Sequence, residues 1–452
     1  MATDLIKALI EVVGRRYVVA DSDLSARYRT DWTGRFGGHD AVVVRPATID
    51  ETSAVIRIAL ARGLPVVPQG GNTGLVGGSV PSSDGAIILS TERLTTIGAL
   101  DDRAGQITVG AGVTLSALGD ALDGSGWRFA VDLGARDSAT IGGMVATNAG
   151  GMRVFRFGPM RAQVMGLEYV RADGEVVQRL GGVVKDNTGY DVASLICGSE
   201  GTLAIVTAVR LRLVVDPTER TTALLGFRTA AEARNAAWAL RNACPVVEVV
   251  EYISGPCADL VSSVVGIERP IDAPELLLVE AGAESGTTGL LGDAVAALGD
   301  VVLDVAVAEG DARRSQLWRF RDDITTSLAT LGPVAKYDVS IPSRAVDVFR
   351  AEVGSVVGAF DADAWWFGHV CDDNLHLNVT GLDPGRVADL DGSVLALVAV
   401  HGGSISAEHG IGRSKAGYLN LARSSVEVEL FRRIKAAFDP LGILNPGVIL
   451  EA

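Results

Sequence analysis

Apolar and polar positions alternate in short blocks along the first part of the chain. Residues 41–46 form an apolar run that ends at a proline, typical of a buried strand, and residues 49–62 carry apolar side chains at helical spacing after a threonine cap. Residues 64–68 are again extended, and residues 85–90 predict another strand. This β-α-β unit, followed by short strands and glycine-rich turns to about residue 213, predicts an α+β domain.

A second block of mixed periodicity follows a polar stretch at residues 214–220, which has the composition of a linker. Alanine-rich helical stretches (230–242 and 311–331) alternate with extended runs (275–279 and 365–370). This pattern predicts a second α+β domain.

The two ends of the chain each predict a helix. Residues 1–19 carry charged side chains inside an apolar stretch, as an amphipathic surface helix does and a signal peptide does not, and residues 426–438 predict a charged helix. We therefore expect an α+β protein with domains at residues 1–215 and 216–400, and a C-terminal segment at residues 401–452.

Composition narrows the range of functions. Lys and Arg number 40 against 55 Asp and Glu, for a formal charge of −15, which disfavours capture of nucleic acid or anionic membranes but allows a locally basic pocket. The 4 cysteines form no CxxC pair, so we expect no disulfide framework and a reducing, cytoplasmic environment. No window approaches the length of a membrane-spanning apolar helix, so we expect no membrane span.

Three glycine-rich segments carry the first chemical signal. Residues 68–78 (PQGGNTGLVGG) directly follow a predicted strand, and residues 140–151 and 198–203 are similar in kind. Glycines let the backbone approach a ligand and turn its N–H groups inward, which suits a diphosphate, and we expect the side chains of Asn72 and Thr73 to add hydrogen bonds. Three such segments in one domain predict a long cofactor, although neither GxGxxG nor GxxxxGK is present to indicate NAD or a nucleoside triphosphate.

The amino-acid sequences of these segments resemble the motifs of one flavoprotein family. PQGGNTGLVGGSVP, DLGARDSATIGGMVATNAGG and CGSEGTLAIV are similar, in the same order, to motifs of the vanillyl-alcohol oxidase or p-cresol methylhydroxylase family. Within its D-2-hydroxyacid dehydrogenase branch they resemble the D-2-hydroxyglutarate dehydrogenases. The resemblance implies a two-subdomain FAD-binding domain, an α+β substrate (cap) domain and a C-terminal segment that completes the active site.

The resemblance also implies which residues bind FAD. They are Pro68, Gln69, Gly70, Gly71, Asn72, Thr73, Gly74, Gly77, Ser138, Gly142, Thr147, Asn148, Gly151, Glu200, Gly201, Ile205 and Asn445. Some relatives tether the flavin through a histidine, but this chain has none between His39 and His369, so we expect non-covalent FAD.

A histidine cluster lies in the later half of the chain. A hairpin predicted around residues 371–374 would bring His369 and His376 together, and Glu408 and His409 follow in a glycine-rich segment. Two imidazoles and one carboxylate form the pattern of a catalytic divalent metal site, although hydrogen-bonded histidines at sheet edges explain the spacing equally well.

In the resembled family the segments GHxGDGNLHLN and EHGIG supply a zinc-type site. Carried over by position, the metal ligands are His369, His376 and Glu408, and His409 is the catalytic base that also contacts substrate. Zinc is the expected metal, with manganese or iron as alternatives. This chain has Cys371 and an aspartate two residues later where the family has glycines, so a strained turn and an adventitious thiol ligand are open possibilities.

Substrate contacts are implied at four further positions. Arg321 and Thr325 stand one turn apart on a predicted helix, Lys336 opens a predicted strand, and Asn378 shares a strand face with His376. An arginine fork pairs with a carboxylate through two parallel hydrogen bonds, which fixes the orientation of an acid substrate. Each charge taken alone is better explained as an ordinary surface charge paired with a nearby aspartate, and only their combination indicates a binding site.

The resemblance implies metal-assisted, FAD-dependent oxidation of a D-2-hydroxy acid, with D-2-hydroxyglutarate giving 2-oxoglutarate as the expected reaction. A D-lactate or glycolate dehydrogenase of the same fold, a non-catalytic flavin subunit and a metal-dependent hydrolase are the alternatives. The implied electron acceptor is an electron-transfer flavoprotein or a quinone-linked carrier. The oligomeric state, including a homodimer, stays open.

Overall fold

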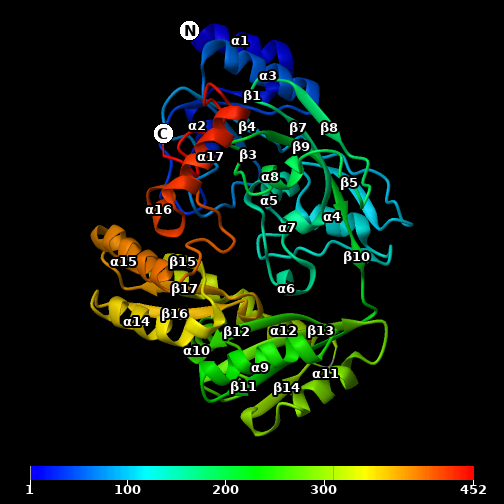
Figure 1. The fold of residues 1–452 in the computed structure, drawn as a ribbon, viewed down its shortest axis with the longest axis vertical. Helices are drawn as coiled ribbons and strands as arrows, with labels where there is room; N and C mark the ends of the chain where they lie inside the picture. The colour runs from blue at the N-terminus through cyan, green and yellow to red at the C-terminus, as the bar shows by residue number, and fades with distance from the viewer. Residues whose placement is uncertain (1, 309, 452) are drawn as a thin grey trace. The chain divides into compact units, whose positions relative to one another are not determined.

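The computed structural model describes residues 2–308 and 310–451, which divide into two compact units. The first unit contains the chain up to Gly150, Gly158–Asp216, and the tail from Glu408 (Figure 1). The second contains Gly151–Phe157 and Pro217–Ala407. Each unit has its own sheets and buried cores, so the predicted α+β class is confirmed.

The first unit opens with the predicted β-α-β unit. Strand β2 (Ala41–Val44) pairs in parallel with β4 (Ala86–Ser90), which pairs in parallel with β3 (Val66–Gln69). Helix α3 (Ile49–Arg62) has the predicted bounds, because the Thr48 side chain accepts a hydrogen bond from the Glu51 N–H at its start and its end is a left-handed glycine. This arrangement places the first glycine loop at the carboxyl end of β3.

The N-terminal helix is shorter than predicted. Helix α1 (Ala2–Val13) buries Leu5, Leu9 and Val13 in the core under α3. The chain then turns at Arg15–Tyr17 and continues as the short strand β1 (Val18–Val19), which pairs antiparallel with β2. The helical prediction is therefore wrong after Val13, and residue 1 lies outside the described residues.

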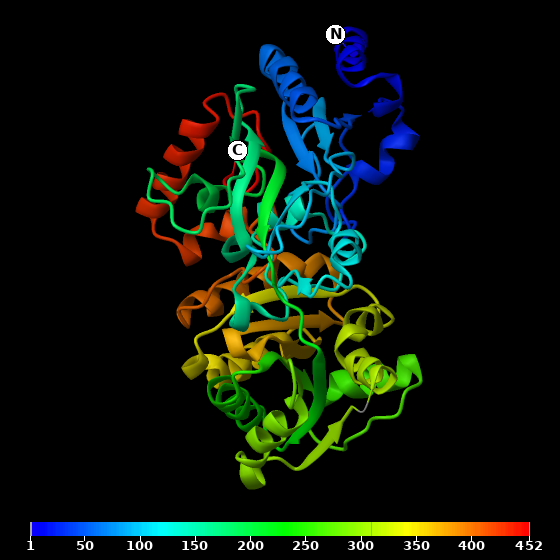
Figure 2. The ribbon, with the colours of Figure 1, turned by 90° about the vertical axis from the view of Figure 1, so that its right-hand side faces the viewer.

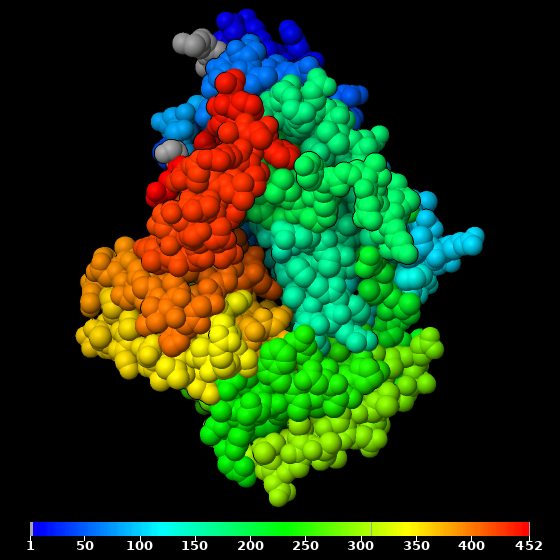
Figure 3. All heavy atoms as spheres, in the orientation of Figure 1, coloured from blue at the N-terminus to red at the C-terminus, as the bar shows by residue number. Residues whose placement is uncertain are grey.

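A second four-stranded sheet carries the other two glycine-rich segments. Its antiparallel order is β5-β9-β7-β8, and the bounds are Gln106–Gly110, Ile205–Arg212, Val164–Val170 and Val176–Arg179. Helix α5 (Ile141–Thr147) packs on this sheet through Ile141, Met144 and Val145. The predicted C-terminal helix is α17 (Ser425–Phe438), whose exposed side is visible in Figure 3.

The second unit, coloured green to orange in Figure 2, is built on a seven-stranded antiparallel sheet. Its strand order is β14-β11-β13-β12-β16-β17-β15. In that order the strands are Asp304–Val307, Glu219–Phe227, Glu275–Ala283, Val247–Ser254, Asp363–Gly368, Asn374–Thr380 and Ala335–Ser340. Alternate residues of the central strands face a core that includes Leu224, Ile253, Leu278 and Phe367. This face packs against α10 (Gly255–Val265), α12 (Asp311–Asp322) and α13 (Ile324–Ala329).

The opposite face of this sheet packs against other helices. The ring of Trp366 on β16 meets that of Phe349 on α14 (Val346–Gly358). Helix α9 (Ala230–Ala243) contacts β11, β12 and β13, and α15 (Val387–Val400) contacts β15. Among the described residues, none of the helices combines the length and apolar character that crossing a bilayer requires.

Candidate functional site

The first glycine loop lies directly against the start of α5. A Cβ at Gly70 would overlap the Thr140 hydroxyl, and one at Gly71 would overlap the carbonyl oxygen of Ser138. Only glycine fits such approaches, so these two residues bring the first two glycine-rich segments together. The result is a cradle in which the Gly70–Gly71 backbone packs directly against the Thr140 hydroxyl and the Ser138 carbonyl oxygen.

Asn72 supports the loop through its side chain. Its backbone is left-handed, with a φ of 54°, and its side-chain N–H groups donate to the carbonyl oxygens of Arg27 (3.3 Å) and Thr30 (2.8 Å). Its side-chain oxygen accepts a hydrogen bond from Ser79 at 2.7 Å. The amide is thus committed to the protein, which differs from the expectation that it reaches the diphosphate. The group that this position can still offer to a ligand in the adjoining cavity is its backbone.

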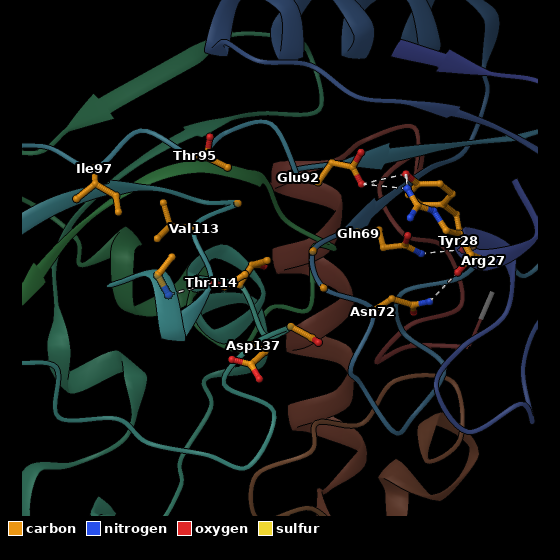
Figure 4. A pocket seen from close by; sticks show the side chains of 16 residues that line it. Arg27, Tyr28, Gln69, Asn72, Glu92, Thr95, Ile97, Val113, Thr114 and Asp137 are labelled. Atoms are coloured by element: carbon orange, nitrogen blue, oxygen red, sulfur yellow. Dashed lines mark hydrogen bonds and ion pairs between the residues drawn. The ribbon is translucent and has the colours of Figure 1, made fainter. Parts of the chain in front are cut away.

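A cavity of about 570 Å³ adjoins the cradle (Figure 4). The Gly70–Asn72 backbone, Ser138 and Thr140 are among its lining residues, and Figure 4 shows Arg27, Tyr28 and Glu92 grouped at one side of it. The loop backbone and small side chains of the lining suit the diphosphate part of a dinucleotide and fit FAD, while its charged side chains are Arg27, which pairs with Glu92, and Asp137.

The third glycine-rich segment is tied to the C-terminal tail. Both carboxylate oxygens of buried Glu200 accept backbone hydrogen bonds at 2.8 Å, from Ile411 and Gly412. Burial raises the pKa of Glu200 to about 7, although these two N–H groups and Lys415 act in the opposite direction. The Asn445 side chain donates to the carbonyl oxygens of Gly78 (2.8 Å) and Glu200 (2.7 Å), which links the first loop to the third.

The remaining residues expected to bind FAD are positioned mainly by local packing. Gly142 approaches Ala111, Gly201 approaches Pro68, Gly77 approaches the ring of Phe36, and Thr147 donates to the carbonyl oxygen of Gly143. Asn148 ends α5 in a left-handed conformation, the Gln69 side chain donates to the carbonyl oxygens of Tyr28 and Ser79, and Ile205 begins β9 in a buried core. Thr73 and Gly74 follow Asn72 in the loop, and Gly151 belongs to the second unit.

In the second unit, the structure brings His369 and His376 together as predicted. His376 lies on β17 opposite Phe367 of β16, and His369 follows the end of β16, one residue beyond the strand. The two Nε2 atoms are 3.4 Å apart and both side chains are buried. Two nitrogen ligands of one tetrahedral zinc, each roughly 2.0–2.1 Å from the metal, lie roughly 3.3 Å apart. The pair therefore fits a divalent metal ion.

Two carboxylates on the flanking strands orient these imidazoles, and the sequence analysis missed both. His369 Nδ1 is 2.5 Å from Glu251 on β12, and His376 Nδ1 is 3.5 Å from Asp338 on β15. A carboxylate at Nδ1 leaves Nε2 for the metal, an arrangement common in histidine metal sites. The available signal was an acidic residue at a core-facing position of an otherwise apolar strand, as in VVEVVEYIS.

The electrostatics of this cluster follow from its burial. Burial would raise the pKa of Glu251, but the adjacent His369 and Arg321 outweigh it and hold the pKa at about 2. Burial lowers the pKa of His376 and that of Lys336. An ionised carboxylate and a neutral imidazole are the protonation states that a metal site needs.

The turn between the histidines resolves the question raised by its unusual sequence. Asp373 takes the left-handed conformation, with a φ of 65°, whereas Cys371 lies in the 3-10 turn Val370–Asp372 and carries no positive φ. The Cys371 thiol donates to the carbonyl oxygen of Ala237 at 3.4 Å, and burial raises its pKa. A protonated, hydrogen-bonded thiol does not act as a thiolate ligand, so the structure gives no support for Cys371 in a metal site.

The residues expected to bind substrate lie on two separate helices and two paired strands. Arg321 lies in the last turn of α12 and its Nε is 2.5 Å from Glu251, but the helix is interrupted at Asp323 and Thr325 lies on α13. The prediction of one uninterrupted helix, with Arg321 and Thr325 one turn apart on it, is wrong. On the sheet, Lys336 lies directly opposite Asn378, so both share the face that carries His376.

Glu408 and His409 stand where the chain passes from one unit to the other. Ala407 ends the second unit, where its N–H donates to the carbonyl oxygen of Asp338 at 3.2 Å, and Glu408 is the next residue. Within the first unit, Gly150 is so close to Glu408 that a Cβ would overlap its carboxylate. Chain connectivity thus holds Glu408 one peptide bond from a residue anchored beside the histidine-bearing sheet.

Comparisons with known proteins cover the whole chain. Residues 216–449 match the model of the C-terminal domain of FAD-linked oxidases, and residues 41–179 match an FAD-binding domain. The mitochondrial D-2-hydroxyglutarate dehydrogenase of Bos taurus is 36% identical, over 100% of this chain and 84% of that protein. The D-2-hydroxyglutarate dehydrogenase of Xanthomonas citri is 38% identical, over 94% of this chain and 92% of that protein.

Solved structures with low identity share the fold. p-Cresol methylhydroxylase with substrate bound matches with a TM-score of 0.79 at 16% identity, covering 100% of this chain and 97% of its own. The 4-ethylphenol oxidase of Gulosibacter chungangensis in complex with isoeugenol has a TM-score of 0.78 at 17% identity, covering 99% and 97%. These matches confirm the predicted p-cresol methylhydroxylase-type fold.

Proposed function

Because this chain belongs to the FAD-linked oxidase family and, within it, to the D-2-hydroxyglutarate dehydrogenases, we propose that it oxidises D-2-hydroxyglutarate to 2-oxoglutarate. FAD-dependent oxidation of a D-2-hydroxy acid is the activity that the full-length relatives support. The observation that carries the finer proposal is the pair of Nε2 atoms 3.4 Å apart, on the sheet face that also carries Lys336 and Asn378.

Two groups bound to the protein would supply chemistry that side chains lack. FAD held by the glycine loops would accept the hydride removed from the hydroxyl-bearing carbon. A divalent cation, zinc by preference and manganese or iron otherwise, would be held by His369, His376 and Glu408 and would lower the pKa of the substrate hydroxyl.

The remaining roles belong to the chain's own side chains. We assign His409 as the base that takes the hydroxyl proton on a ring nitrogen, since a neutral imidazole accepts protons near neutral pH. Arg321 and Lys336 would each hold a carboxylate, with Thr325 and Asn378 as polar contacts that fix substrate orientation. Two cationic residues suit a dicarboxylate such as D-2-hydroxyglutarate, whereas D-lactate and glycolate, the alternative substrates, have one carboxylate each.

Replacement of His409 tests this assignment. The His409→Ala variant should be folded and yellow, because His409 is not needed to hold FAD, while substrate bleaches its flavin at least about 100-fold more slowly. The measurement is anaerobic stopped-flow absorbance after adding D-2-hydroxyglutarate. His39→Ala is the matched control, since His39 pairs with Asp84 on the surface and should leave bleaching unchanged. Undiminished bleaching in His409→Ala would remove His409 from the role.

The reduced flavin needs an electron acceptor, and we propose an electron-transfer flavoprotein or a quinone-linked carrier.

We also propose a cytoplasmic location, supported by four buried cysteines that are all free thiols. Bovine and other eukaryotic relatives are named as mitochondrial, while the bacterial relatives carry no such label. Fractionation of the native cell and reduction of each candidate carrier by the purified protein test both points.

A further inference from the structure

We propose that Glu251 is a positioning residue that holds the metal ligand His369 with one carboxylate oxygen and the substrate-binding Arg321 with the other. This inference deepens the function proposed above and rests on it. Glu251 lies in the middle of β12 and is fully buried. Its Oε1 is 2.5 Å from His369 Nδ1 and its Oε2 is 2.5 Å from Arg321 Nε.

The contact with His369 fixes which ring nitrogen carries the proton. A carboxylate oxygen of Glu251 lies 2.5 Å from Nδ1, where it accepts a hydrogen bond, and this contact favours the tautomer that carries its hydrogen on Nδ1. The Nε2 lone pair is then directed toward His376, whose Nε2 is 3.4 Å away. Without the carboxylate, the ring can rotate or adopt the other tautomer, and either change weakens a metal site.

The strand order makes this arrangement symmetric. β16 and β17, which lead to and carry the histidines, lie between β12 with Glu251 and β15 with Asp338. Asp338 Oδ1 is 3.5 Å from His376 Nδ1 and also accepts a hydrogen bond from Asn374 at 2.8 Å. Each imidazole therefore has a carboxylate from a flanking strand at its Nδ1, on the side of the ring away from the Nε2 pair. The shorter contact, at Glu251, is the stronger constraint.

The contact with Arg321 fixes the guanidinium. Its Nε end is taken up by Glu251 and its plane lies over the ring of Phe367, with 4.9 Å from Cζ to the ring centroid. The Nη atoms are at the other end of the fork, which is the end suited to a substrate carboxylate. One carboxylate thus fixes the distance between a metal ligand and a substrate-binding group.

The competing explanation is that Glu251 only docks α12 onto the sheet. Glu280 on the neighbouring strand β13 provides a direct comparison, because its carboxylate docks α12 onto the sheet. Glu280 is 1% exposed and accepts hydrogen bonds from Arg314 at 2.8 and 3.0 Å and from Trp318 at 2.8 Å, all on the same helix. Arg314 and Arg321 are two helical turns apart on α12. The two carboxylates differ in their other partner. Glu251 also contacts a histidine, whereas Glu280 accepts hydrogen bonds from Arg314, Trp318 and Thr222.

Three variants separate the two explanations: Glu251→Gln, Glu251→Ala and the control Glu280→Gln. Glutamine has one acceptor oxygen for two donors and alanine has none. Metal-free protein of each variant is titrated with Zn²⁺ against a chromophoric chelator, Co²⁺-loaded protein is examined by visible absorbance, and KM for D-2-hydroxyglutarate is measured on loaded protein.

We expect the Zn²⁺ dissociation constant to rise about 10-fold in Glu251→Gln and about 100-fold in Glu251→Ala. The Co²⁺ bands should shift and KM should rise in both. Glu280→Gln should lose thermal stability yet keep the metal affinity, Co²⁺ spectrum and KM of the unmodified protein. If Glu251→Ala does not fold, Glu251→Gln carries the test.

Unchanged Zn²⁺ affinity and Co²⁺ spectrum in the folded Glu251 variants would overturn this inference and leave the proposed function intact. Equal losses in Glu251→Gln and Glu280→Gln would also overturn it, since the effect would then be structural. If the unmodified protein binds no divalent cation, the metal assignment of the proposed function fails, and this inference fails with it.

Discussion

At the scale of single residues, the cofactor loop depends on how closely two backbones approach. Gly71 and Gly74 belong to the same loop, yet only Gly71 has a neighbour that excludes a side chain. The carbonyl oxygen of Ser138 occupies the position of its missing Cβ, whereas no atom lies within 4 Å of a Cβ at Gly74. Neither residue has a positive φ, so the difference between them is steric and not conformational.

A pair of alanine variants tests this point. Gly71→Ala should push the loop away from Ser138 and remove most bound FAD, because a backbone carbonyl cannot yield as a flexible side chain does. Gly119→Ala, at an exposed position of helix α4 (Leu115–Leu122) where no atom lies within 4 Å of a Cβ, should retain FAD close to the level of the unmodified protein. The measurement is the ratio of visible flavin absorbance to protein absorbance after gel filtration. Full flavin content in Gly71→Ala would contradict the cradle described above.

At the scale of elements, the turn between β16 and β17 sets the geometry of the histidine pair. The resembled family has glycine at both positions where this chain has Cys371 and Asp373, but the two positions have different requirements. Asp373 is left-handed, with a φ of 65°, while Cys371 is buried against α9 and has no positive φ. The Arg241 side chain, on α9, donates to the Cys371 carbonyl oxygen at 2.5 Å and holds the turn in place.

Restoring each glycine separately should have opposite effects. Asp373→Gly should raise stability by up to about 1 kcal/mol, because glycine adopts the left-handed region without steric cost. Cys371→Gly should lower it by about 2 kcal/mol, because it empties a buried site and adds backbone freedom. Thermal unfolding followed by circular dichroism measures both. A lower midpoint for Asp373→Gly, or no loss for Cys371→Gly, would show that the turn is built differently.

Local sequence signals predict these elements well where the determinants lie close along the chain. Helix α3 was predictable to the residue, because its cap, its apolar face and its terminal glycine are all local. The break between α12 and α13 at Asp323 was not, since both halves have helical periodicity. Glu251 and Asp338 could not be assigned to the site either, because their histidine partners are 118 and 38 residues away and are reached only through strand pairing.

At the scale of the whole molecule, an acidic chain places two cationic side chains near the buried histidine pair of its second unit. The formal charge is −15, yet Arg321 and Lys336 supply positive charge beside the histidine pair. Fold and family follow from long motifs whose order along the chain is visible in the sequence. The hydrogen bonds of the Asn72 side chain to the protein backbone could not be predicted from the sequence. An asparagine in a glycine-rich loop has the same sequence signal whether its amide stabilises the loop or binds a ligand.

The most direct test of the central claim is an anaerobic titration of the purified protein with the two enantiomers of 2-hydroxyglutarate. The D enantiomer should bleach the visible flavin band and release one 2-oxoglutarate for each flavin reduced, while the L enantiomer should leave the band unchanged. A flavin that stays fully oxidised in excess D-2-hydroxyglutarate, in protein loaded with FAD and a divalent metal, would contradict the proposed function.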